Sequence, residues 1–259
     1  MAAAYCCSGA AASASWVGIC ARLAAGSDDA PGPVPRLAAM TSPDPAPPRP
    51  RVHVLTLRPD GAREETARRV GAVLAEAFAT DPYTLGLVPE DRREARLERK
   101  FTAAVRHGLR AGADGVPLGA VDVAVDADHG TLLGAAVWTS PAAPRGVDVP
   151  GLLAGLPTAV AVHGRHTLAL KRIQAACERA RPAGRHWYLE EVGTAPSARG
   201  RGAASALVRH GQRRAAGLPV HLEASVPATV PFYERLGFRA TGHVPVPGGE
   251  PLTCLRWEA

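Results

Sequence analysis

Hydrophobic positions in this chain follow two periods, one typical of strands and one typical of helices. Residues 52–57 alternate polar and apolar side chains, which is the pattern of a half-buried strand. Residues 64–78 instead carry Val70, Leu74 and Ala77 three or four positions apart, which places them on one face of a helix. The pattern therefore predicts a strand followed by an amphipathic helix.

The same two periods continue to the C-terminus. Strands and helices alternate along the chain, and this alternation predicts an α/β fold. The sequence Asp81-Pro82-Tyr83 is expected to end the first helix. The further expected elements are a charged helix at 91–110, strands at 120–125 and 131–139, one or two helices over 151–181 with a break near 163–164, a strand from residue 187, a helix at 205–216, a strand at 220–224, a short helix at 230–236, and an antiparallel pair at 238–244 and 253–257.

Composition is that of a globular protein with a basic surface. The chain has 259 residues, of which 46% are hydrophobic and 21% are charged, and its net charge is +6. Lysine occurs only at Lys100 and Lys171, so the basicity comes from arginine and is explained most simply by composition. The basic residues are not interleaved with aromatic ones, as a nucleic-acid stacking surface requires. We therefore expect no nucleic-acid partner, although a polyanionic cofactor would benefit from the positive field.

The first fifty residues differ from the rest of the chain. Residues 2–25 are small and mildly apolar without a preceding Lys or Arg, and residues 27–50 are rich in Pro, Ala and Asp. We expect 1–50 to be a disordered extension or a misassigned start, with Met40 as an alternative first residue, and 51–259 to be the folded domain. No apolar run suits a membrane span, so a cytoplasmic protein without a membrane partner is expected.

Cysteines give no sign of a metal centre or a disulfide framework. Three of the five lie in the first fifty residues, and the remaining two are Cys177 and Cys254. Neither has metal-ligand spacing, which predicts a protein without a metal in a reducing compartment.

The most informative stretch is residues 187–207. Trp187, Tyr188 and Leu189 suit a strand, and Gly193 within it indicates a bulge or a close backbone approach. A turn with two glycines follows at 199–202, and a good helix-forming sequence begins after it. Strand, Gly-rich turn and helix make an anion site, because the first helical N–H groups lack partners and point at the turn. The spacing is neither the dinucleotide-binding nor the P-loop pattern.

Two blocks of this chain together resemble the GNAT superfamily of N-acetyltransferases. The first is Arg199-x-x-Gly202-x-Ala204, and the second is the sequence Val-Pro-Phe-Tyr-Glu-Arg-Leu-Gly-Phe at 230–238. The resemblance implies a mixed central sheet of about six to seven strands, flanked by helices and splayed at a slot for acetyl-CoA, the expected co-substrate. It implies that backbone amides of the loop 199–204 hold the pyrophosphate, that the strand edge at 192–194 pairs with the pantetheine arm, and that the charge of Arg201 favours the anion. The coenzyme-binding residues are then expected to be Val192, Gly193, Thr194, Arg199, Gly200, Arg201, Gly202, Ala203, Ala204, Ser205 and Thr229.

The resemblance also implies residues for the chemistry. Tyr233 matches a tyrosine that acts as the acid near the coenzyme sulfur, although a packing role is the alternative. Glu190 matches a position that carries a catalytic histidine in some relatives, and a carboxylate there is a candidate base. Because successive strand residues face opposite sides, we expect only one of Glu190 and Glu191 to face the cleft. Thr229 stands where many relatives have Asn, which weakens one hydrogen bond that the family pattern implies.

The acceptor is expected to be a small-molecule amine, with a puromycin-like aminonucleoside as one form. Its pocket is expected to include Asp81, Tyr83, Trp138 and Tyr188, since acidic and aromatic groups suit a cationic amine. The alternatives are a peptide or protein amine as acceptor, or a non-catalytic acyl-CoA-binding regulatory module. The oligomeric state is expected to be monomer or homodimer. Because no cysteine lies in the core motif, direct attack in a ternary complex is the expected mechanism.

Overall fold

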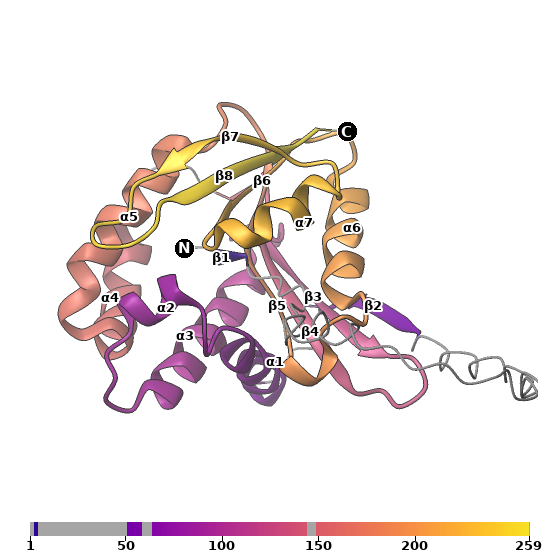
Figure 1. Cartoon of the computed structure of the whole chain (residues 1–259), viewed down its shortest axis with the longest axis horizontal. Coiled ribbons are helices and arrows are strands. Elements are labelled where there is room, and N and C mark those ends of the chain that lie inside the picture. The colour runs from indigo at the N-terminus through magenta and orange to yellow at the C-terminus, as the bar shows by residue number, and fades with distance from the viewer. Residues whose placement is uncertain (1–2, 5–50, 59–63, 144–148, 259) are drawn as a thin grey trace, which may run out of the picture. The chain divides into compact units, whose positions relative to one another are not determined.

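The computed structural model describes residues 3–4, 51–58, 64–143 and 149–258, all of which belong to one compact unit. Their centre is a mixed sheet with the strand order β2-β3-β4-β5-β1-β6-β8-β7 (Figure 1). The strands are β1 (Ala3–Ala4), β2 (Val52–Thr56), β3 (Gly119–Asp126), β4 (Leu132–Thr139), β5 (Trp187–Thr194), β6 (Val220–Ala224), β7 (Arg239–Val244) and β8 (Leu252–Trp257). The α/β class predicted from the hydrophobic periods is confirmed.

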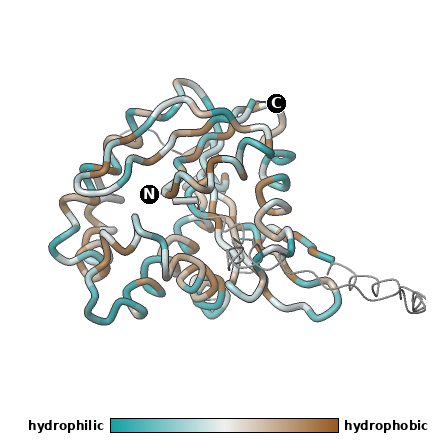
Figure 2. The backbone as a smooth tube through the Cα atoms, in the orientation of Figure 1, coloured by the Kyte–Doolittle hydropathy of each residue, from teal (hydrophilic) through white to brown (hydrophobic). Residues whose placement is uncertain are grey.

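Helices cover both faces of this sheet (Figure 1). One hydrophobic cluster joins the sheet to α1, α3 and α5, and a second joins its other face to α6 and α7. In Figure 2 the apolar stretches recur along the central strands and helices, as the amphipathic patterns require. The helices are α1 (Glu64–Ala77), α2 (Pro82–Leu87), α3 (Arg93–Gly108), α4 (Val149–His163), α5 (Thr167–Ala180), α6 (Ala203–Ala215) and α7 (Val230–Glu234).

The predicted break in the long helical region is confirmed, and one helix was missed. A 3-10 turn at Gly164–His166 separates α4 from α5, and Gly164 has a φ of 50° that suits glycine. The segment that we expected only to end a helix also begins α2. Asp81 caps that helix by accepting a hydrogen bond from the Thr84 N–H, and Pro82 occupies its first turn.

Strands β5 and β6 pair only where they begin. Their parallel register covers Trp187↔Val220 and Tyr188↔His221, and farther along β1 lies between them, with Ala4 beside both Val192 and Ala224. The spacing of the two strands therefore grows from about 4.8 Å to about 9.6 Å, one and two strand separations. We call this opening the fork. It confirms the splayed sheet that the family resemblance implied beside 192–194.

A register shift in β5 lies earlier than the sequence suggested. Val137 of β4 pairs with Glu191, and Trp138 pairs with Leu189. The backbone of Glu190 therefore has no pairing partner on β4, and Glu190 forms the bulge. Gly193 marks a close approach instead. A Cβ there would lie 2.8 Å from the Cβ of Ala77 on α1, which explains why glycine is needed.

The predicted division of the chain at residue 50 remains a prediction. Apart from Ala3–Ala4, the segment 1–50 lies outside the described residues. The predicted first strand at 52–57 and the first helix at 64–78 are confirmed as β2 and α1.

Candidate active site

A surface cavity lies against the face of the sheet that α3, α4 and α5 cover. Its volume is 680 Å³. Glu190 and Glu191 line it from β5, Thr139 lines it from the end of β4, and Lys100 and His107 line it from α3. Glu178 of α5 lines it as well, so the cavity combines three carboxylates with several cationic groups beside the fork.

Only one carboxylate oxygen of Glu191 has a hydrogen-bond partner among the described residues. Its Oε1 accepts a 2.6 Å hydrogen bond from Nζ of Lys100, whose ammonium lies 3.7 Å from the ring centroid of Phe101. Its Oε2 is buried and has no hydrogen-bond partner among the described residues. Burial raises the pKa of Glu191, and the nearby Lys100 charge offsets only part of that rise. A carboxylate with a raised pKa and a free oxygen is suited to accept a proton.

Glu190 is held by the neighbouring strand. The Glu190 carboxylate accepts a hydrogen bond from the hydroxyl of Thr139, and Glu190 is 8% exposed. The bulge makes this arrangement possible, because it turns Glu190 to the same face as Glu191. The expectation that only one of the two glutamates faces the cleft is therefore wrong, since both line one cavity.

The predicted anion site has the expected backbone shape. Gly200 and Gly202 have φ values of 76° and 84°, and Gly202 caps α6 without any side-chain hydrogen bond. Ala203 and Ala204, the first helical residues, are buried. The first-turn N–H groups of α6, which include Ser205, are thus available to an anion, and the helix dipole favours one. The turn fits the pyrophosphate of a coenzyme.

Two side chains assigned to the coenzyme are engaged elsewhere. The guanidinium of Arg201 forms an ion pair with Asp126, whose pKa is about 2 because of hydrogen bonds from the Asp128 N–H and from Arg201. The hydroxyl of Thr229 donates to the carbonyl of Val226 over 2.7 Å. The charge of Arg201 is therefore largely neutralised by Asp126. The Thr229 hydroxyl stabilises the turn that contains it. Backbone groups rather than these side chains fit the coenzyme.

Tyr233 lies on the opposite face of the sheet from the cavity. It is fully buried on α7, and its ring meets those of Phe232 and Phe238 edge-on at 5.0 and 5.8 Å. It belongs to the same hydrophobic cluster as Val192 and Ala224, which flank the fork. Tyr233 and the two glutamates are thus on opposite faces of the sheet at the fork.

The four residues predicted to contact the acceptor do not line the cavity. Asp81 is buried, with one oxygen accepting from the Thr84 N–H and the other from the Ser225 hydroxyl, both at 2.8 Å. Tyr83 is 9% exposed and packs in the core of the α1 side. Trp138 is fully buried under α6, on the face opposite the cavity, so its expected place in the pocket is corrected.

Tyr188 also has a different position from the one expected. It is 1% exposed, and its hydroxyl donates to Oε2 of Glu223 over 2.6 Å. Cys254 lies opposite Glu223 on β8. Together with His221, these two residues offer metal-ligand atoms within 4.8 Å of one another. Both oxygens of Glu223 are already hydrogen-bonded, and burial raises the pKa of Cys254 to about 11, so the contacts are those of a hydrogen-bond network.

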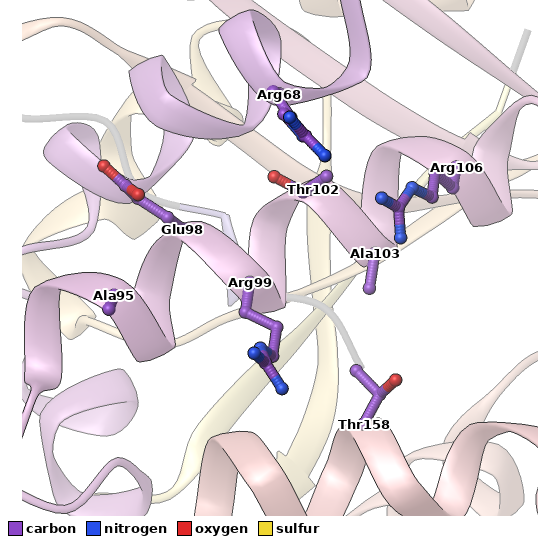
Figure 3. A pocket seen from close by; sticks show the side chains of 8 residues that line it. All are labelled: Arg68, Ala95, Glu98, Arg99, Thr102, Ala103, Arg106 and Thr158. Carbon is purple, nitrogen blue, oxygen red and sulfur yellow. The ribbon is translucent and has the colours of Figure 1, made fainter. Parts of the chain in front are cut away.

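The second cavity, of 410 Å³, is shown in Figure 3. Arg68 reaches it from α1, and Arg99 and Arg106 reach it from α3. Glu64 binds both Arg68 and Arg106. None of the residues predicted for catalysis lines this cavity, so it is not the candidate site.

Sequence reasoning missed Lys100 and Thr139 as partners of the glutamates. Lys100 is 91 positions from Glu191, and a charged helix face gives no sign of which charge turns inward. The only available signal was rarity, since Lys100 is one of two lysines in the chain.

Within the described residues, no helix is both long enough and apolar enough to cross a membrane.

Comparisons with known proteins identify relatives of this chain. A family model described as an acetyltransferase (GNAT) domain matches residues 160–240. A crystal structure described as histone acetyltransferase HPA2 and related acetyltransferase from Corynebacterium glutamicum is 30% identical, with a TM-score of 0.58, over 80% of this chain and 97% of that one.

Two further structures share the fold alone. Arylalkylamine N-acetyltransferase 2 from Aedes aegypti is 13% identical with a TM-score of 0.53, over 80% of this chain and 98% of that one. An agmatine N-acetyltransferase is 17% identical with a TM-score of 0.50, over 80% of this chain and 99% of that one. Taken with the first relative and the family model, the fork, the Gly-rich turn and α6 show that the chain belongs to the GNAT acetyltransferase family.

Proposed function

We propose that this protein transfers the acetyl group of acetyl-CoA to the amine of a small molecule bound beside Glu190 and Glu191. The observation that carries the proposal is the pair of buried carboxylates in one cavity next to the fork. An amine is protonated at neutral pH and must lose a proton before it can attack a thioester. Acetyl-CoA, when bound, supplies that thioester.

The chain offers a fitting place for the coenzyme. The uncapped N-terminus of α6 suits the pyrophosphate. At Val192 the fork is one strand wide, and β1 fills it in the structure by pairing with β5. An extended pantetheine arm carries amides, so it can pair with the edge of β5 in the place of β1. Backbone N–H groups of Val192 or Thr194 would then be available to the acetyl carbonyl oxygen.

Glu191 is our choice for the base. Its free Oε2 can accept the proton from the bound ammonium, and its raised pKa brings the carboxylate closer to the pH at which proton transfer is efficient. Lys100 keeps the other oxygen in place. Glu190 is the alternative base, although Thr139 already donates to its carboxylate.

Tyr233 is proposed as the acid that protonates the departing thiolate. Its position supports this role, since it is buried in the same hydrophobic cluster as Val192 and Ala224, which flank the fork. A role in packing alone is the competing explanation, because its ring is enclosed by Phe232 and Phe238.

For the acceptor we propose an amine of the puromycin type, on the basis of the resemblance of the chain's motifs to puromycin N-acetyltransferase. A peptide or protein amine is the alternative within the enzyme class. A third possibility is a regulatory module that binds acyl-CoA without turnover. Acetyl transfer would be direct, in a ternary complex, since Cys177 and Cys254 are buried thiols whose pKa values are about 12 and 11.

The test is thiol release from acetyl-CoA by the full chain with a panel of amines. The panel contains puromycin, agmatine, an arylalkylamine and a short peptide with a free N-terminus. Mass spectrometry of the amine establishes where the acetyl group goes. Acetylated puromycin supports the whole proposal, and acetylation of the peptide alone supports the alternative acceptor. Tight binding of acetyl-CoA without release of thiol by any amine would favour the regulatory module.

A further inference from the structure

A buried hydrogen-bond network joins β5 and β6 at the point where their backbone pairing stops. Tyr188 of β5 donates from its hydroxyl to Oε2 of Glu223 on β6, over 2.6 Å. The other carboxylate oxygen of Glu223, Oε1, lies 3.0 Å from Nε2 of His221. Glu223 and His221 have no exposed surface, and Tyr188 is 1% exposed. We call these three residues the fork network.

The groups around Glu223 do not neutralise it by a direct ion pair with Lys or Arg among the described residues. Burial, with the Glu223 charge as a second cause, raises the pKa of Cys177 to about 12 and that of Cys254 to about 11, so both thiols are neutral. Arg181 lies over the ring of Tyr188, with its guanidinium carbon 3.5 Å from the centroid. The buried carboxylate is therefore stabilised by its two hydrogen bonds and by the charge of the nearby Arg181.

The network lies at the root of the fork. Tyr188↔His221 is the last backbone pair of the two strands, and at Val192 and Ala224 a whole strand fits between them. Beyond that pair β5 and β6 do not pair with each other directly, and each pairs with β1 instead. The bond from Tyr188 to Glu223 crosses from one strand to the other just beyond that last pair. It is thus placed to set the width of the opening.

We propose that the fork network holds β5 and β6 at the separation that positions the thioester end of acetyl-CoA. The inference rests on the proposed acetyl transfer. All three are positioning residues, because none of them lines the cavity where the amine would bind. Burying a carboxylate costs desolvation free energy, and an apolar residue at position 223 would pack in the core without that cost. Such a residue, however, would form no hydrogen bond between the two strands.

The proposal depends on hydrogen bonds and not on the charge of Glu223. Glu223→Gln keeps an acceptor oxygen for the Tyr188 hydroxyl, and its N–H can donate to His221 when Nε2 of that ring is the unprotonated nitrogen. Tyr188→Phe keeps the ring and removes the bond between the strands. If Glu223 instead carried protons during the reaction, the glutamine variant would be the damaging one.

The experiment is calorimetric titration of the full chain with coenzyme A, which needs no turnover. Tyr188→Phe is expected to weaken coenzyme binding about tenfold, the usual effect of losing a hydrogen bond to a charged group. Glu223→Gln is expected to bind within about threefold of the unmodified chain, since the bond from the Tyr188 hydroxyl, which joins the two strands, is kept. Val244→Ala, a buried truncation on β7, controls for lost stability and is expected to bind coenzyme A normally.

Kinetics supply the second readout. In Tyr188→Phe the KM for acetyl-CoA should rise while the KM for the amine stays the same, which a general loss of folded protein would not produce. Equal coenzyme binding by Tyr188→Phe and the unmodified chain would overturn the inference alone. So would a Glu223→Gln variant that binds coenzyme A but has lost turnover. Failure of the unmodified chain to bind coenzyme A would overturn the proposed function and this inference with it.

Discussion

The backbone of Glu190 has no pairing partner on β4, and this bulge determines that both neighbouring carboxylates line the cavity. In a regular strand Glu190 and Glu191 would point to opposite faces. Because the register passes from Leu189 directly to Glu191, both carboxylates reach the same cavity. The two acids were identified from the sequence, whereas their common facing was not, because a bulge depends on pairing with β4.

Tyr233 allows a test in which the ring is kept. If its hydroxyl protonates the leaving thiolate, Tyr233→Phe should lower kcat by about 10²-fold, the lower end of general acid catalysis. The KM for the amine should change little, since the ring still packs against Phe232 and Phe238. Initial rates of thiol release measure both quantities. An unchanged kcat would leave Tyr233 with a packing role only.

At the scale of elements, the local motifs were predictable and the long-range contacts were not. The strand, Gly-rich turn and α6 follow from residues adjacent in sequence, and so does the break at Gly164–His166. Helix α2 was missed because Asp81-Pro82 both ends one helix and begins another. The ion pair between Lys100 and Glu191 depends on α3 packing against β5, which no local pattern encodes.

The packing of α6 on the sheet predicts a large difference between two glycine substitutions. A Cβ at Gly211 would lie 2.2 Å from Cζ2 of the buried Trp138. Gly211→Ala should therefore destabilise the protein by about 1–3 kcal/mol, despite the better helix propensity of alanine. Gly155→Ala in α4 is the matched control, since a Cβ there meets nothing within 4 Å.

Urea unfolding of both variants measures the effect. The control should be neutral or stabilised by about 0.5–1 kcal/mol, because alanine replaces glycine inside a helix. Equal stability of the two variants would contradict the close contact between α6 and Trp138.

At the scale of the whole molecule, one histidine between two helices makes the folding stability depend on pH. His163 ends α4, is 5% exposed, and its Nδ1 lies 2.8 Å from the carbonyl oxygen of Leu87 on α2. Burial lowers the pKa of His163 to about 4, against an ordinary value of 6.5. Between these two values the unfolded chain binds a proton that the folded chain excludes, so folding stability falls as the pH falls.

This dependence can be isolated with His163→Gln, which keeps a donor for the Leu87 carbonyl and removes the titration. The free energy of unfolding of the unmodified protein should decrease from pH 6.5 to pH 4, and the decrease should be smaller in the variant. Urea unfolding at several pH values provides the comparison. Parallel pH dependences would show that His163 is protonated as easily in the folded protein as in the unfolded chain.

The measurement that tests the account most directly is the pH dependence of kcat/KM for amine acetylation, compared between the unmodified protein and Glu191→Gln. The base must be ionised, so activity should fall as the pH drops through the raised pKa of Glu191. Glu191→Gln should lower kcat/KM by about 10²-fold or more and remove that acidic limb. A weakly basic aromatic amine, already neutral, should be much less affected. A variant with the same rate and the same pH profile as the unmodified protein would contradict the assignment of Glu191 as the base.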